Sequence, residues 1–206
     1  MSYSLGRIAL LLSGCLVLGA GVALLLTADL GSDGYSTLVS GVAIGLDIPF
    51  LFANAIIGLL FLVLAASRRL YPGPGTLVQV VVVGATVSLL LGVLATPDGL
   101  AGRIGMLVLA FPVLALGIAA YLGSQSGAGP AEAAALAWDP PVPFRWSYSV
   151  VQGGGALVGW LLGATVGPGT LAVIVLLGPA VDVTSRCLQL DVHQRAAPRR
   201  AAECGP

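Results

Sequence analysis

The sequence predicts an all-α, polytopic membrane protein with six transmembrane helices, arranged as two inverted-topology repeats of three. The first observation is composition: 57% of the 206 residues are hydrophobic and 9% are charged, whereas soluble domains carry about 25% charged residues. The second is a series of apolar runs, each close to the roughly 20 residues that a helix needs to cross a bilayer. The third is an internal repeat, in which the segment GPGTL occurs twice.

The long apolar runs are the predicted transmembrane helices. The first run follows a single arginine and precedes all the others, so we interpret it as a retained helix and not as a cleaved signal peptide. The six runs are 8–27, 50–66, 74–95, 104–123, 146–165 and 169–188.

Two shorter helices are predicted between the long ones, at 35–46 and 130–138. Lipid tolerates a broken helix only where protein or water shields its ends, so we interpret both as re-entrant or interfacial. Asp33 and Glu132 lie near their starts, where a carboxylate favours the helix dipole. Capping is the first interpretation for both acids. The alternative is that they gate a central cavity framed by the two short helices.

The arginines predict the orientation of the chain. If the short helices do not cross and the N-terminus is cytoplasmic, every arginine except Arg103 falls on the cytoplasmic side, as the positive-inside rule expects. We therefore expect both termini in the cytoplasm. Residues 1–190 would form one membrane domain, and the polar tail 191–206 would be disordered.

The repeat relates the two halves of the membrane domain. A shift of the chain against itself superposes Gly73–Leu77 on Gly167–Leu171, and the repeats span about 7–95 and 103–190. Each repeat contains three crossings, so the second copy enters the membrane from the opposite side. Inverted repeats of this kind are common in secondary transporters.

Two glycine patterns predict helix starts and helix packing. Proline suits the first helical turn because it needs no backbone donor there, and threonine can bond the free amides. We interpret GPGTL as a helix start used in packing; contact with an anionic ligand is the alternative. In the fifth run, glycines recur at every fourth residue, which predicts close packing of this helix. We interpret the packing as internal to one protomer, and a homodimer contact is the alternative. The residues are Gly73, Pro74, Gly75, Thr76, Gly167, Pro168, Gly169 and Thr170 in the helix starts, and Gly155, Gly159 and Gly163 in the packing face.

Polar side chains inside the apolar runs are the candidates for a substrate cavity. Asn54, Gln79 and Gln152 lie well inside their runs, where hydrogen bonding between neighbouring helices is the ordinary role. Asp182 lies about 20 Å into the last run at 1.5 Å per residue. An ion pair with Arg186 at the cytoplasmic edge is its first interpretation. A carboxylate that responds to protons or substrate is the second.

The sequence lacks the motifs of enzymes and of metal or cofactor sites. The sole histidine, His193, lies in the tail, so neither a His-based triad nor a helical zinc motif can form. The chain has no lysine, so GPGT is not a nucleotide-binding loop. Cys15, Cys187 and Cys204 form no disulfide framework. We expect no enzyme activity, no cofactor, no metal and no nucleic-acid partner.

The run AGVALLLTADLGSDGYSTLVSGVA, the two GPGTL starts, SGAGPAEAA and GWLLGATVGPGTLAVIVLLGPAVD together resemble the YczE/YitT-like family of bacterial integral membrane proteins. The family pattern implies Gly-Pro-Arg-Asp where this chain has Gly-Pro-Ala-Glu at 129–132, so the acid is retained as Glu132. It also implies an Arg and Glu pair where Tyr148 and Gln152 align, so that charge pair is neutral here. The resemblance implies a polytopic plasma-membrane protein and no established reaction.

Two functions compete. The leading one is a small secondary transporter or permease for an unknown small solute, motivated by the inverted repeat and the paired short helices. The alternative is a non-transporting assembly or regulatory subunit that acts with a membrane partner protein. A midplane cavity bounded by both short helices would favour transport, and a closed, apolar interior would favour the subunit. A homodimer in the lipid bilayer is compatible with both.

Overall fold

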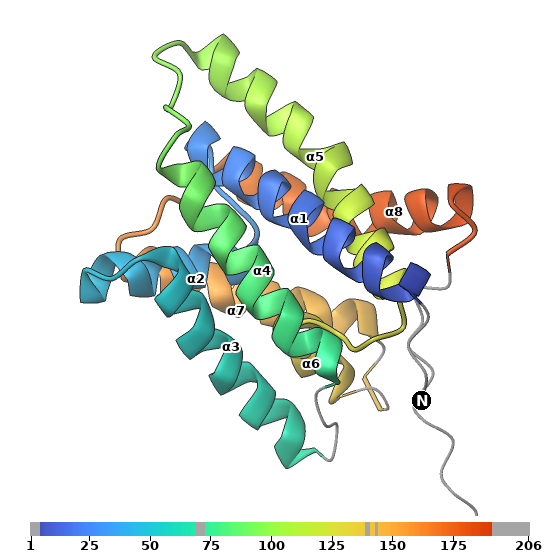
Figure 1. Ribbon diagram of the computed structural model, residues 1–206. Helices are drawn as coiled ribbons and strands as arrows, with labels where there is room; N and C mark the ends of the chain where they lie inside the picture. The colour runs from blue at the N-terminus through green and yellow to red at the C-terminus, as the bar shows by residue number, and fades with distance from the viewer. Residues whose placement is uncertain (1–4, 69–72, 139–140, 143, 191–206) are drawn as a thin grey trace, which may run out of the picture.

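The computed structural model describes residues 5–68, 73–138, 141–142 and 144–190, without the side chains of Leu136, Phe144, Arg145 and Asp182. The predicted tail, 191–206, lies outside the described residues. Within them the chain forms eight helices and no strand (Figure 1). The predicted all-helical class is therefore confirmed.

Six of the helices are long, and they occupy the predicted apolar runs. Proline is the first residue of α4 and of α8, as each GPGTL motif predicts, and glycine precedes it at the N-cap. The long helices are α1 (Leu5–Ala28), α3 (Phe50–Ser67), α4 (Pro74–Leu91), α5 (Leu100–Gly123), α7 (Phe144–Leu161) and α8 (Pro168–Cys187), and the short ones are α2 (Gly34–Leu46) and α6 (Pro130–Leu136).

Five of the described helices are long and apolar enough to cross a membrane, namely α1, α3, α4, α5 and α8. The molecule is thus a membrane-embedded helical protein. Helix α7 has 18 residues, as α3 and α4 do, but it is not among the five. Its polar residues, including Tyr148 and Gln152, and its run of glycines lower its hydropathy. A sixth crossing therefore stays a prediction.

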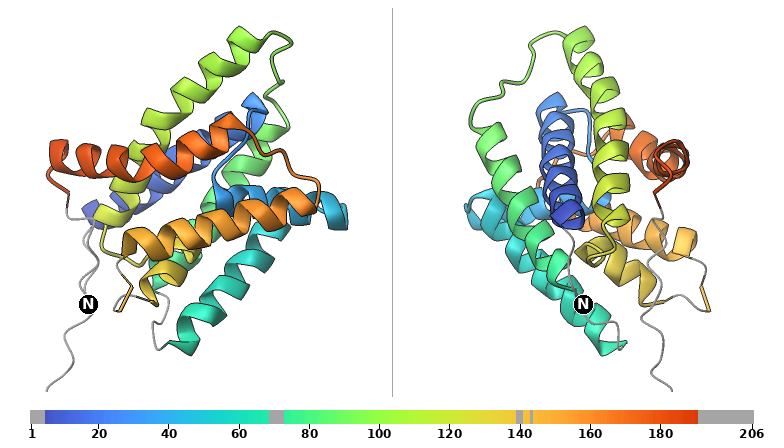
Figure 2. Two further views of the ribbon diagram at one scale, coloured as in Figure 1. Left: turned by 180° about the vertical axis from the view of Figure 1, so that it is seen from behind. Right: turned by 45° about the vertical axis from the view of Figure 1, so that its right-hand side comes forward.

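Helices α1 and α5 form a closely packed antiparallel pair at the centre of the molecule (Figure 2). A Cβ atom at Gly14 would lie 2.5 Å from the backbone nitrogen of Tyr121, and one at Gly117 would lie 2.5 Å from that of Leu18. Only glycine permits this approach of two helix backbones. Helix α4 packs against α1, and α8 packs against α5.

The two GPGTL helix starts lie at opposite ends of the α1 and α5 pair. The amide of Gly75 in α4 donates to the carbonyl of Ser126, just after α5, over 3.0 Å. The amide of Gly169 in α8 donates to the carbonyl of Leu30, just after α1, over 2.9 Å. Because α1 and α5 run antiparallel, these two junctions are at opposite ends of the molecule.

The threonines of the two motifs have different partners. The prediction was that Thr76 bonds the free amides of its own helix. Instead, Thr76 Oγ1 donates to the carbonyl of Ala128 over 2.7 Å. In α8 the amide of Gly167 donates to Thr170 Oγ1 over 3.4 Å, which is the predicted kind of cap. Both motifs hold a helix start against the other half of the chain.

The short helices also pack across the halves, α2 against α7 and α6 against α3. A Cβ at Gly155 would lie 2.6 Å from the carbonyl oxygen of Gly34, and one at Gly159 would clash with the carbonyl of Thr37. The prediction that Gly163 extends this face is wrong. The helix ends at Leu161, and Gly163 follows with φ 97° in a Schellman turn closed by the bond from the Ala164 amide to the Gly159 carbonyl, 2.9 Å.

Candidate functional site

A cavity of about 50 Å³ lies at the centre of the helices, and every one of the eight helices contributes to its lining. Leu18 of α1, Val83 of α4, Leu114 of α5 and Leu177 of α8 line it from near the midpoints of their helices. The cavity therefore lies level with the middle of the long helices. The starts of both short helices, at Asp33 and Pro130, border it directly.

Five of the six polar residues that the sequence offered as cavity or gate candidates line this one cavity. They are Asp33, Asn54, Gln79, Glu132 and Gln152. The sixth, Asp182, belongs to α8, but its side chain lies outside the described part of the structure, so neither interpretation of it is tested.

Asp33 caps α2 with one oxygen and leaves the other without a partner. Its Oδ2 atom accepts a hydrogen bond from the amide of Ser36 over 3.0 Å, which is the predicted cap. Its Oδ1 atom is buried and has no hydrogen-bond partner, and the whole residue is only 8% exposed. A buried, unpaired carboxylate oxygen is costly, so it requires a proton or a ligand.

Glu132 lies in the first turn of α6 and faces the same cavity. The hydroxyl of the fully buried Tyr121 donates to its carboxylate, and the amide of Gly129 donates to that hydroxyl over 3.4 Å. Asp33 and Glu132 both lie outside the membrane-spanning helices, and burial raises the pKa of each carboxyl. The charge of Asp33 adds to the rise for Glu132.

A chain of hydrogen bonds joins the polar wall of the cavity across α2 and α7. The amide of Tyr35 donates to Gln152 Oε1 over 2.8 Å, and Gln152 Nε2 donates to the hydroxyl of Tyr148 over 2.7 Å. Gln152 thus bonds a neighbouring helix and lines the cavity at the same time.

A second chain of hydrogen bonds joins α2, α3 and α4. The hydroxyl of Tyr35 donates to Asn54 Oδ1 over 3.0 Å, and Asn54 Nδ2 donates to the carbonyl of Val80 over 2.8 Å. Tyr35 and Tyr148 line the cavity, Tyr121 bonds Glu132 beside it, and none of the three was predicted from the sequence. The one available signal was the place of Tyr148, one helical turn before Gln152.

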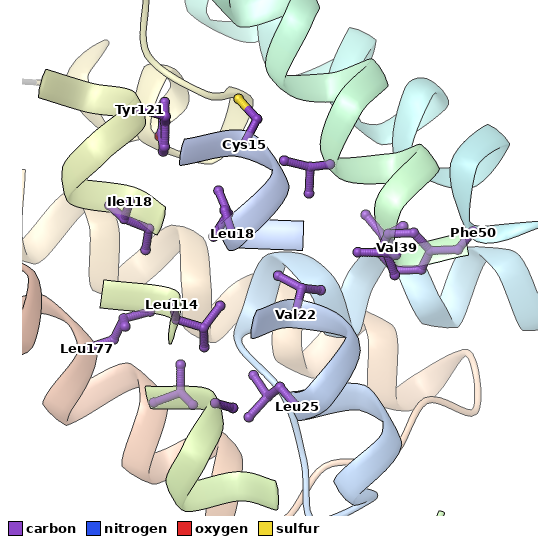
Figure 3. Packing of buried hydrophobic residues seen from close by; sticks show 14 of the residues in the cluster. Cys15, Leu18, Val22, Leu25, Val39, Phe50, Leu114, Ile118, Tyr121 and Leu177 are labelled. Carbon is purple, nitrogen blue, oxygen red and sulfur yellow. The ribbon is translucent and has the colours of Figure 1, made fainter. Parts of the chain in front are cut away.

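The rest of the cavity lining is apolar, and Figure 3 shows several of these side chains. These side chains come from α1, α4, α5, α6 and α8, with one aromatic ring from α3. None of the described residues that line the cavity is basic. The apolar residues labelled in the figure that line it are Leu18, Val22, Phe50, Leu114, Ile118 and Leu177.

A second cavity, of about 180 Å³, lies toward the end of the molecule where α1 ends. Ser32, which lines it, immediately precedes Asp33 of the central cavity. Asp29 also lines it and is held by an ion pair with Arg103 at 3.2 Å and by the hydroxyl of Thr165 at 2.8 Å. The two cavities are thus separated by a short stretch of the segment between α1 and α2.

Residues 5–186 match a family of unknown function, DUF6198. The chain is also 28% identical over 179 residues to an uncharacterized protein of Haemophilus influenzae, covering 85% of this chain and 81% of that protein. No solved structure matches the chain.

Proposed function

Given that the chain belongs to DUF6198, a family of unknown function, we propose its role from the cavity: it is a small secondary transporter or permease of the bacterial plasma membrane. The observation that carries the proposal is the position of the cavity, level with the middle of the long helices and bordered by the starts of both short helices. Secondary transporters bind their substrates at such a place, between repeats and against broken helices.

Paired contacts support an inverted repeat of α1–α4 and α5–α8 with six crossings. The packing of α4 on α1 has its counterpart in α8 on α5, and that of α2 on α7 has its counterpart in α6 on α3. Backbone conformation repeats as well. Asp29 and Gly31 have positive φ after α1, and Gln125 and Gly127 have positive φ at the same places after α5.

Charge supports the predicted orientation. Arg7 lies in the first turn of α1, Arg68 follows α3 and Arg186 lies in the last turn of α8, and these three helix ends lie at one end of the molecule. Arg103 lies at the start of α5, at the opposite end. Excess arginine marks the cytoplasmic side, so we place both termini there. We also propose that the chain is related to the YczE/YitT-like proteins, which its glycine motifs resemble.

The alternative, a non-transporting assembly or regulatory subunit, is favoured by the small size of the cavity. About 50 Å³ holds only a few water molecules. A transporter with such a site would carry a very small solute, or would enlarge the site when it opens. Under both proposals we expect no enzymatic reaction and no cofactor.

Reconstitution of the full chain in liposomes tests the proposal. We expect substrate-dependent flux for at least one member of a panel of small cations, anions and neutral solutes, above the flux of protein-free liposomes. The variant D47N changes an exposed acid that does not line the cavity and should retain the flux. An absence of flux across the panel, with a single stoichiometric partner recovered by affinity purification, would support the subunit instead.

A further inference from the structure

The polar wall of the central cavity is rich in hydrogen-bond acceptors. Asp33 Oδ1 is buried without a partner, and the carboxylate of Glu132 has lone pairs beyond those that Tyr121 and its own backbone amide engage. The hydroxyl oxygen of Tyr35, which donates to Asn54, adds a further acceptor. The same lining also holds donors, namely the Gln79 amide and the Ser36 hydroxyl, but a ligand that pairs with Asp33 Oδ1 must itself donate a hydrogen bond.

The start of α2 offers little to an anion, although a helix N-terminus usually attracts one. The amide of Tyr35 is already bound to Gln152, and that of Ser36 to Asp33. Gly34 packs directly against the backbone of Gln152. The protein therefore uses these donors itself, and the charged groups that face Asp33 across the cavity are acidic or tyrosyl: Glu132 from α6, Tyr148 from α7 and Tyr35 from α2.

The remaining walls favour an organic cation over a metal ion. The apolar side, formed by residues such as Val22, Leu114 and Leu177, offers no oxygen ligand. Among the described residues no group of three or more His, Cys, Asp or Glu side chains could hold a metal ion. The ring of Phe50 lines the same cavity and can face a cation or an alkyl group. About 50 Å³ limits the ligand to a few heavy atoms.

We propose that the central cavity binds a small primary ammonium ion with a short alkyl group, whose N–H groups donate to Asp33 Oδ1 and whose alkyl group lies against the apolar wall. This inference rests on the proposed function, because it names the class of solute that the same cavity would bind. Glu132 supplies the second negative charge from the opposite short helix. Asp33 thereby both starts α2 and binds the ligand.

Equilibrium binding of radiolabelled methylammonium to the purified full chain tests this proposal. We expect saturable binding that ethylammonium displaces and that acetate and ethanol, of similar size but negative or neutral charge, do not displace. The variant D33N should weaken binding about 10- to 100-fold, as the loss of a charged hydrogen bond predicts. D47N, the same change at an exposed acid, should bind as the native protein does.

Asparagine also caps helices well, so D33N should retain the start of α2. If D33N does not purify as a single species, E132Q provides the same test at the second acid. The proposal is overturned if methylammonium does not bind saturably, if acetate displaces it, if sodium or potassium displaces it as readily as ethylammonium, or if D33N binds it with native affinity.

The result separates this inference from the proposed function. Methylammonium binding without flux in liposomes supports the ammonium site and contradicts transport. Flux of an anion or a neutral solute by a protein that does not bind methylammonium contradicts the ammonium site and supports transport.

Discussion

The two carboxylate oxygens of Asp33 have different surroundings, and the difference gives this residue its importance. Oδ2 replaces the missing acceptor at the start of α2, which any Asp, Asn or Ser could do. Oδ1 is buried and has no partner, in a residue that lines a cavity to which every helix contributes. An Asp whose second oxygen was hydrogen-bonded would be only a cap, whereas this one also has a buried oxygen that a proton or a ligand can satisfy.

The buried acids predict how the stability of the ligand-free protein depends on pH. Burial raises the pKa of Asp33 and of Glu132, and Tyr35 and Tyr148, which face them, bring no positive charge. Acids with a raised pKa in the folded state contribute stability that is complete below their unfolded pKa, about 4, and is lost as pH rises through the folded pKa. We expect the melting temperature in nanodiscs of uncharged lipid to fall as pH rises above about 4.

The variant D33N should show a smaller fall than the native protein, because one of the two titrating acids is removed. D47N should follow the native curve, since Asp47 is exposed and lies at the other end of α2. A melting temperature that rises over the same pH range in the native protein would contradict this account of the cavity.

Sequence alone could identify the polar residues of the site but not their arrangement. Asn54 and Gln152 stood out because amides are uncommon inside apolar runs. Their bonds to Tyr35 depend on α2 lying against α3 and α7, and no local pattern predicts that packing. The unpaired Oδ1 of Asp33 is likewise a property of the assembled cavity. The tyrosines were missed because their rings alone are compatible with ordinary membrane helices.

At the scale of the helices, α7 differs most from the prediction. Its length is that of α3, but its glycines and polar residues lower its hydropathy, and it ends at Leu161. The sequence could place its start and its close-packed face. It could not place its end, because Gly163 is compatible with a continuing small-residue face and with a left-handed turn. The turn forms, and the chain leaves the helix there.

The close packing of α2 on α7 predicts unequal effects at two adjacent glycines. A Cβ at Gly155 would lie 2.6 Å from the carbonyl oxygen of Gly34, whereas one at Gly154 meets nothing within 4 Å. We expect G155A to destabilise the protein by about 1–3 kcal/mol through overpacking. We expect G154A to be neutral or to stabilise by up to about 1 kcal/mol, because alanine favours the helix.

Thermal denaturation of both variants in the same detergent measures the difference. Each adds one methyl group to the same helix, so any general effect of alanine on α7 cancels. Equal melting temperatures for G155A and G154A would show that α2 does not pack on α7 as closely as the structure has it.

At the scale of the whole molecule, the cavity forms because elements of each half pack against elements of the other half. Each short helix packs on a long helix of the other half, and each GPGTL start is bonded to the segment that precedes the short helix of the other half. The repeat in the sequence predicted two related units. It did not predict that they interlock, because a repeat specifies similar units and leaves open how they contact each other. Interlocking is what brings Asp33 and Glu132 to one cavity.

The number of crossings depends on α7, and its two ends give a direct test. If α7 crosses, Val166 after it lies on the same side as Asp98, which precedes α5, and both lie opposite Ser67 and Leu188. If α7 lay along the surface instead, α8 would cross in the opposite direction, Val166 and Leu188 would exchange sides, and the bonds of Thr165 to Asp29 and of Gly169 to Leu30 could not form. Single cysteines at these four exposed positions distinguish the two arrangements.

We expect a membrane-impermeant thiol reagent added to intact cells to label D98C and V166C, in a chain whose native cysteines have been replaced. S67C and L188C should react only after the cells are made permeable, because the arginine-rich end of the molecule faces the cytoplasm. S67C is the control for cell integrity, since α7 has no influence on the side of α3. Labelling of L188C together with D98C, and not of V166C, would show that α7 does not cross. The two halves would then contain unequal numbers of crossings, and the inverted repeat that supports transport would be excluded.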